Sequence, residues 1–92
     1  MQTKAAFGKS LKQLRHARGL TQEDFSTISS RTYISQLERG QKSPTIEKIE
    51  ALAKVLKVHP MSLLSLTYLG TGGHRDLDAL VRRIRADLEG IL

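Results

Sequence analysis

The chain has 92 residues, 39% of them hydrophobic and 26% charged, which is an ordinary composition for one globular domain with a single modest core. It contains no Cys, and its three His residues show no metal-ligand spacing, so we expect no disulfide, no metal and no cofactor. The N-terminus lacks a signal-peptide pattern and no segment is long enough and apolar enough to cross a bilayer. We therefore expect a cytoplasmic protein without a membrane partner.

The net charge of +6 is unevenly distributed along the chain. Residues 1–42 carry eight Lys or Arg against three acids, residues 43–73 carry three against two, and residues 74–92 carry four against four. A basic N-terminal half favours a polyanionic partner, although a solvated basic surface accounts for charge alone equally well. No group of residues typical of an enzyme active site is present, so catalysis is not expected.

The first expected element is a helix over residues 5–18. Phe7, Leu11 and Leu14 are spaced four and three apart, so they form one apolar stripe on that helix. Gly19 ends it, in the position where a left-handed backbone conformation commonly closes a helix.

A second helix is expected to begin at Thr21. Thr21 and Asp24 have the spacing of a capping box, in which a hydroxyl and an acid satisfy backbone N–H groups reciprocally. Phe25 and Ile28 are its expected buried residues.

A third helix is expected over residues 31–39, with Ser30 as its N-cap and Gly40 as its end. Its inward-facing residues are Ile34 and Leu37. A fourth helix, over residues 46–57, has Thr45 as its cap, and a fifth has Pro60 in its first turn. The apolar stripe of the fourth helix consists of Ile46, Ile49, Leu52, Ala53 and Leu56.

A last helix is expected over residues 75–89, after the linker Thr71-Gly72-Gly73. Its apolar positions share one face, and we interpret five of them as a dimer interface: Leu77, Leu80, Val81, Ile84 and Leu88. The fold class is therefore all-α, with a five-helix domain followed by a C-terminal sixth helix. The expected division is a domain over residues 1–69, a linker over 70–74 and a C-terminal helix over 75–92.

Two short segments carry a family resemblance. Arg-Gly-Leu-Thr-Gln-Glu-Asp at residues 18–24 is followed by Tyr-Ile-Ser-Gln-Leu-Glu-Arg-Gly at residues 33–40 and by Ser43-Pro44. Over roughly residues 7–66 the chain resembles the phage repressor and Cro family, also called the XRE family, of helix-turn-helix regulators. The resemblance implies a transcription regulator, expected to act as a repressor, that reads double-stranded DNA as a homodimer with its third helix in the major groove.

The resemblance also implies roles for individual residues. Base contacts are expected from Arg31, Thr32, Ser35 and Gln36, since Arg suits guanine, Gln suits adenine and a Thr methyl suits thymine. Phosphate contacts are expected from Gln22, Ser30, Tyr33, Arg39, Lys42 and Ser43. Gln22 is expected at the N-terminus of the second helix, where free backbone N–H groups favour an anion. Core packing is an alternative role for Tyr33. Arg15 and Glu38 are expected to form a structural ion pair that fixes the third helix.

The chain departs from the family pattern in one place. The family usually has two more residues between its second and third helices, including a Gly, whereas only Ser29 and Ser30 separate Ile28 from Arg31 here. We therefore expect either an early end to the second helix or an unusually tight turn.

A different class of function stays open at this point. The same fold serves in antitoxin-like or adaptor proteins whose C-terminal helix binds a partner protein. A completed monomer core is a further alternative for that helix.

Overall fold

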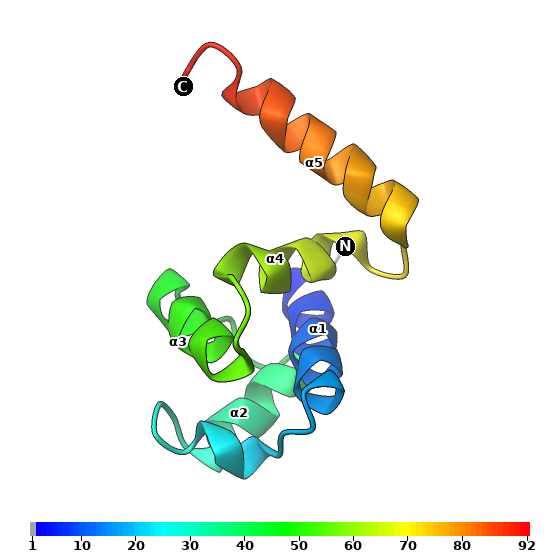
Figure 1. Cartoon of the computed structure of the whole chain (residues 1–92). Helices are drawn as coiled ribbons and strands as arrows, with labels where there is room; N and C mark the ends of the chain where they lie inside the picture. Colours follow the sequence, from blue (N-terminus) through cyan, green and yellow to red (C-terminus); the bar gives the residue numbers. More distant parts are fainter. Residues whose placement is uncertain (1) are drawn as a thin grey trace.

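The computed structural model of the chain describes residues 2–92, which contain helices and no β-strand. The elements are α1 (Thr3–Ala17), the 3-10 helix η1 (Gln22–Phe25), α2 (Arg31–Glu38), α3 (Ile46–Leu56), α4 (Pro60–Leu69) and α5 (His74–Leu88) (Figure 1). The expected all-α class is confirmed. The expected number of helices was wrong, because the described residues form five α-helices and the second expected helix is only the four-residue η1.

The shortened turn explains why η1 is not an α-helix. Asp24 Oδ2 accepts hydrogen bonds from the Thr21 backbone N–H at 2.6 Å and from the Thr21 hydroxyl at 3.1 Å. The Asp24 carboxylate therefore closes the turn as expected for a capping box, and the Thr21 hydroxyl donates a hydrogen bond to this carboxylate. The backbone N–H groups of Ile28 and Ser29 both donate to the Phe25 carbonyl, so the chain turns at once toward α2. Of the two expected alternatives, the early end of the helix is the one observed.

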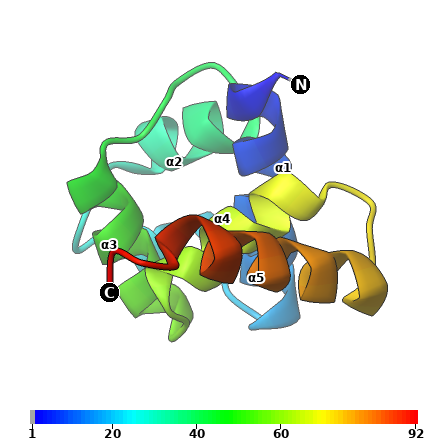
Figure 2. The same ribbon diagram turned by 90° about the horizontal axis from the view of Figure 1, so that it is seen from above.

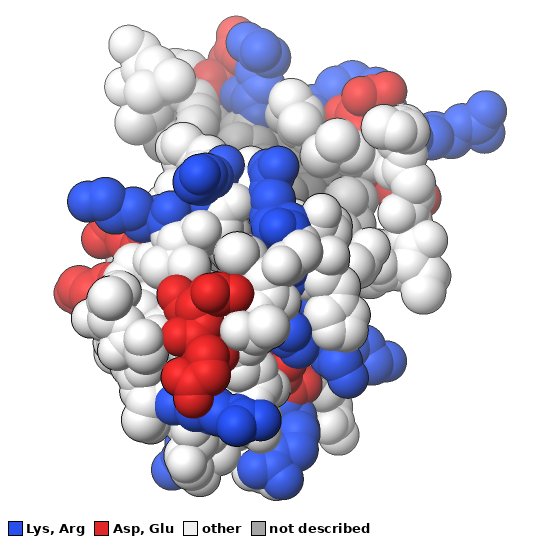
Figure 3. Space-filling model, turned by 60° about the horizontal axis from the view of Figure 1, so that its bottom comes forward, with Lys and Arg blue, Asp and Glu red and all other residues white. Residues whose placement is uncertain are grey.

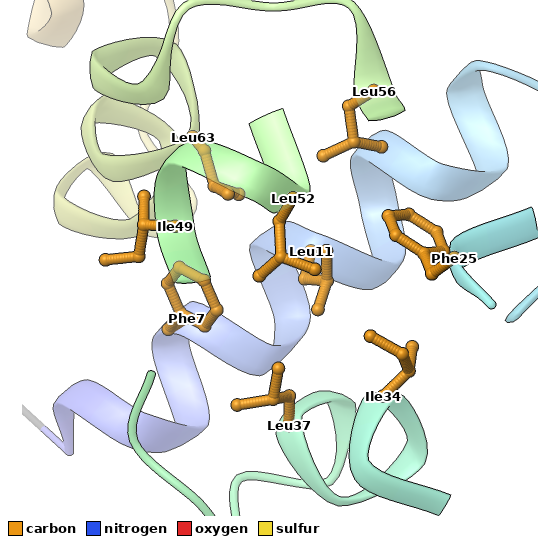
Figure 4. Packing of buried hydrophobic residues seen from close by; sticks show 9 residues of the cluster. All are labelled: Phe7, Leu11, Phe25, Ile34, Leu37, Ile49, Leu52, Leu56 and Leu63. Atoms are coloured by element: carbon orange, nitrogen blue, oxygen red, sulfur yellow. The ribbon is translucent and has the colours of Figure 1, made fainter. Parts of the chain in front are cut away.

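The hydrophobic core lies between α1, η1, α2, α3 and α4 (Figure 4). Its buried cluster consists of Phe7, Leu11, Phe25, Ile34, Leu37, Ile49, Leu52, Leu56 and Leu63. Burying one such side chain contributes about 1.5–3 kcal/mol, so this cluster is the main source of stability. Ile46 departs from the rest of the apolar stripe expected for this helix, since it lies in the first turn of α3 and is 75% exposed.

Local signals set both ends of α2. Ser30 caps the helix, because its hydroxyl accepts a hydrogen bond from the Tyr33 N–H at 3.1 Å. At the other end Gly40 has φ +73°, and a Cβ there would lie 2.9 Å from the Ala5 Cα. Gly40 therefore supplies a left-handed conformation and also lets the chain pass close to α1.

A glycine in the middle of α1 brings α1 and α2 together. A Cβ on Gly8 would lie 2.6 Å from the Glu38 carbonyl oxygen, and it would also collide with the carbonyl oxygen of Leu37. The C-terminal turn of α2 thus rests directly on the backbone of α1. This contact lets α1 and α2 approach each other closely.

The helix α5 lies apart from this core. It leaves the end of α4 and runs back above it, and its main contact with the core is with α4 (Figures 1 and 2). No residue of α5 is buried: Leu77 and Leu80 are half-buried, and Val81 and Leu88 are 47% and 40% exposed. Within residues 2–92, no helix has the length and apolar character needed to cross a membrane.

Candidate nucleic-acid interface

The outer face of α2 is polar. Ile34 and Leu37 are buried on one side of the helix, and each residue advances the helix by about 100°, so the opposite arc faces outward. Arg31 and Thr32 on this arc are exposed, and Ser35 and Gln36 are half-buried. All four residues expected to contact bases therefore lie on one face.

An open hollow joins this arc to η1. It has a volume of about 250 Å³ and is lined by Gln22, Arg31, Thr32, Ser35 and Arg39. Three of the expected base-contacting residues and two of the expected phosphate-contacting residues are thus brought together. Gln36 is on the same face of α2 but outside the lining of this hollow.

Arg15 of α1 and Glu38 of α2 form an ion pair that joins the two helices. The Arg15 Nε and Nη2 atoms donate to the two Glu38 carboxylate oxygens at 2.7 and 3.0 Å, and Nη1 donates to the Leu20 carbonyl at 3.0 Å. The two side chains are only 10% and 4% exposed. The hydrogen bonds that Arg15 donates to Glu38 raise the pKa of the Arg15 guanidinium, although burial acts in the opposite direction.

Gln22 joins the same network. Its side-chain amide donates to Glu38 Oε1 at 3.2 Å, so one residue links η1 to the ion pair while it also lines the hollow. Because η1 has only four residues, a long helix dipole does not contribute to anion binding at Gln22. Contact between Gln22 and a phosphate stays a prediction.

The other residues expected to contact phosphate border the α2 face. Ser30 is exposed at the N-cap, and Tyr33 is half-buried and packs against the core cluster. Arg39 is exposed and its Nε donates to the Ser35 carbonyl at 3.4 Å. Lys42 and Ser43 are exposed in the loop between α2 and α3. Their contacts with DNA stay predictions.

Lys48 of α3 is a residue that the sequence analysis missed. Its Nζ donates to the Ile28 carbonyl at 2.8 Å and lies 5.5 Å from the centre of the Tyr33 ring. The ammonium thus satisfies a carbonyl in the shortened turn and makes a cation–π contact with α2. No sequence signal identifies it, because the contact joins residues 20 positions apart.

The charge around the interface is mixed. Figure 3 shows Lys and Arg side chains on several sides of an acidic patch. Glu23 and Asp24 of η1 are both exposed, and Glu23 lines a second hollow together with Arg31. Positive charge therefore surrounds the α2 face without forming one continuous surface.

The matched family model accounts for this arrangement. A model described as helix-turn-helix matches residues 11–63, which include η1, α2, α3 and the hollow. The chain belongs to the helix-turn-helix family. The resemblance found in the sequence is confirmed, and the protein is a DNA-binding transcriptional regulator.

Similar proteins include other regulators. Control protein C.BamHI of Bacillus amyloliquefaciens is 37% identical over 67 residues, which cover 70% of this chain and 83% of that protein. The uncharacterized HTH-type transcriptional regulator y4dJ of Sinorhizobium fredii (strain NBRC 101917 / NGR234) is 36% identical over 69 residues, covering 73% of this chain and 90% of the relative.

A solved structure with the same fold is the restriction-modification controller protein C.AhdI from Aeromonas hydrophila. It superposes with a TM-score of 0.61 and 36% identity, covering 64% of this chain and 92% of that chain. The helix α5 lies outside the residues that the family model matches.

Proposed function

We propose that the protein reads an inverted-repeat operator as a homodimer, with α2 of each subunit in the major groove of double-stranded DNA, and that it acts as a repressor. The observation that supports this most directly is the polar face of α2. Four side chains able to contact bases lie there, above two buried residues and beside a nearly buried ion pair that holds the helix. A recognition helix needs this combination of a rigid inner side and a polar outer side.

In this proposal Arg31, Thr32, Ser35 and Gln36 read bases. Arg31 is in the first turn of α2, where a helix that enters the groove by its N-terminus makes its deepest contacts. Its guanidinium suits the two acceptors of guanine, and the Gln36 amide suits adenine. A bidentate contact of this kind discriminates against a wrong base by about 1–3 kcal/mol.

Phosphate contacts would fix the position of α2 on the duplex. Ser30 and Gln22 lie at the start of the helix-turn-helix surface, and Arg39, Lys42 and Ser43 follow its end. The groove-facing arc is thereby flanked by a hydroxyl group and an amide on one side and by two cations and a hydroxyl group on the other. Such contacts set register and add affinity that falls with salt, without reading sequence.

The dimer is proposed to form through α5, with residues 1–69 as the DNA-binding domain and residues 70–74 as a linker. Val81, Ile84 and Leu88 are 47%, 36% and 40% exposed, which leaves an apolar stripe uncovered in a single subunit. Two subunits joined in this way would present two α2 helices to half-sites about one helical turn apart.

Selection from a pool of randomised duplex DNA at near-physiological salt tests the proposal. An enriched inverted repeat is the expected result, and its spacing reports the subunit geometry. Affinity for the selected site should fall steeply with salt and exceed affinity for random duplex by at least about 10³-fold. Recovery of no motif would contradict sequence reading and favour a module that binds another protein through α5.

A further inference from the structure

The apolar stripe of α5 is symmetric along the helix. Its members Leu77, Val81, Ile84 and Leu88 are separated by four, three and four residues, so the spacing is the same from either end. This alternation of three and four residues is the pattern of a two-helix seam. The two central members are exposed, and with Leu88 they line a groove of about 430 Å³ on the C-terminal half of the helix.

We infer that α5 pairs with α5 of a second copy in antiparallel orientation, and that Asp78 and Arg85 exchange two symmetric ion pairs across this seam. The inference rests on the dimer proposed above and adds its geometry. Antiparallel stacking places Leu77 against the partner's Leu88 and Val81 against the partner's Ile84. Every apolar layer is then filled by one side chain from each of the two identical chains, and the two-fold axis relates the layers in pairs.

The charges beside the seam select the orientation. Asp78 and Arg85 each directly follow a seam residue, so they lie on the same flank of the stripe, two helical turns apart. In the antiparallel pair this flank faces the same flank of the partner. Asp78 then lies beside the partner's Arg85, and the reverse contact follows by symmetry. Both side chains are exposed and neither has a hydrogen-bond partner among the described residues, so both are free to pair.

A parallel pair would not use these charges. In a parallel pair each flank of the stripe faces the other flank of the partner. Arg85 would then face the partner's Leu80, and Asp87 would face the partner's Leu92. On the other flank of the stripe, Leu80 faces a charged residue of the partner in either orientation. Only Asp78 and Arg85 therefore distinguish the antiparallel pair from the parallel one. Parallel alignment of the two helix dipoles is also less favourable than antiparallel alignment.

Cysteine cross-linking of the full chain tests the orientation, because the natural sequence contains no Cys. Leu77→Cys and Leu88→Cys are prepared separately, and each is equilibrated in a glutathione redox buffer alone and mixed with the other. A disulfide requires Cα atoms within about 7 Å. Residues 77 and 88 are about 16 Å apart along a helix, so an antiparallel pair joins only unlike variants.

The expected result is a covalent dimer in the mixture and none in either variant alone. Dimers that form equally well within a single variant would indicate a parallel pair and overturn the inference. Absence of any covalent dimer would overturn it as well. Neither residue is buried, so circular dichroism should show that both variants keep the fold.

Charge reversal provides a second test by analytical ultracentrifugation. Asp78→Arg and Arg85→Asp should each raise the dimer dissociation constant roughly 10-fold, and the double variant should recover most of the loss. Arg82→Asp, on the outer side of the helix, is the matched control and should change the dissociation constant much less. A double variant no better than its parents would contradict the ion pairs.

The two proposals fail in distinguishable ways. If the protein selects an inverted repeat but forms no 77–88 cross-link, the proposed DNA reading stands and the dimer must form through another surface. A 77–88 cross-link in a protein with no sequence preference would support the α5 pair and remove the proposed operator reading.

Discussion

Arg15 of α1 and Glu38 at the end of α2 form a two-pronged ion pair, with hydrogen bonds of 2.7 and 3.0 Å between side chains that are almost fully covered. Glu38→Ala leaves the Arg15 guanidinium without its partner and Gln22 without its acceptor. Because an unpaired, nearly buried charge is costly, we expect the free energy of unfolding to fall by about 3 kcal/mol or more. Urea denaturation followed by circular dichroism measures the change.

Glu38→Gln serves as the control for shape. It keeps an oxygen that accepts a hydrogen bond from Arg15 but removes the charge, so its loss of stability should lie between those of the wild type and Glu38→Ala. If both variants were as stable as the wild type, the ion pair would not hold α2 in place.

Gly8 sits where α1 touches the end of α2, and Gly8→Ala tests that contact. In an exposed helix interior this change stabilises a protein by about 0.5–1 kcal/mol. Here the new methyl group would meet backbone carbonyls of Leu37 and Glu38, which cannot move without shifting α2. We expect a net destabilisation of about 1–3 kcal/mol, measured by thermal or urea unfolding.

Gly19→Ala is the matched control, because Gly19 supplies a left-handed backbone conformation whereas Gly8 allows the close approach of two helices. Gly19 has φ +68° and open space around its Cβ position, so its substitution should cost only about 1–2 kcal/mol of backbone strain. The decisive difference is in binding: Gly8→Ala should also weaken sequence-specific DNA binding by moving α2, whereas Gly19→Ala should leave it nearly unchanged. Equal DNA affinity for both variants would contradict a positioning role for Gly8.

Local signals made much of the fold predictable. Ser30 and Thr45 were identified as caps because a short hydroxyl side chain before an apolar period satisfies free N–H groups, and both accept the expected hydrogen bonds. The core positions of α1 and α2 follow from helical spacing alone. Ile46 fits the same spacing, but it lies in the first turn of α3, where no neighbouring helix covers it.

Apart from the Arg15–Glu38 ion pair, which the family resemblance implied, contacts between distant segments were the part that the sequence could not reveal. The spacing around Ser29 and Ser30 showed that the turn is short, but not that η1 would take the 3-10 form. Lys48 reads as an ordinary surface lysine, yet it binds a carbonyl 20 residues earlier. Gly8 reads as a weak point in a helix, and only the approach of α2 explains it.

Arg31 and Lys42 should differ in how their loss affects DNA binding. Arg31→Ala is expected to reduce the free-energy difference between specific and non-specific binding by about 1–3 kcal/mol, because it removes a proposed base contact. Lys42→Ala should weaken binding to all duplexes alike and lower the slope of log affinity against log salt by about 1, because it removes a phosphate contact. Fluorescence anisotropy with the selected duplex and a scrambled one, over a range of salt, measures both quantities.

Gln36→Ala belongs with Arg31→Ala in this experiment. It should also lower discrimination, at a different base position. Equal losses on the selected and scrambled duplexes for all three variants would show that the proposed division into base-reading and phosphate-binding residues is wrong.

Lys48→Met should loosen the turn before α2. The variant keeps a long unbranched side chain but loses the ammonium group, and with it the hydrogen bond to the Ile28 carbonyl and the cation–π contact with the Tyr33 ring. We expect about 1 kcal/mol of lost stability and a loss of discrimination between duplexes. Lys54→Met, an exposed lysine on the same helix, is the matched control. A salt slope reduced as much as in Lys42→Ala would indicate that Lys48 contacts phosphate directly.

A chain that stops at Gly70 tests whether α5 is separable from the domain. Because α5 has no buried residue, the free energy of unfolding of the remaining helices, measured at a concentration where the full chain is monomeric, should change by less than about 1 kcal/mol. Light scattering should give a dimer mass for the full chain and a monomer mass for the shortened one. The same mass for both would mean that α5 is not the dimer element, and a shortened chain that failed to fold would mean that α5 completes the core.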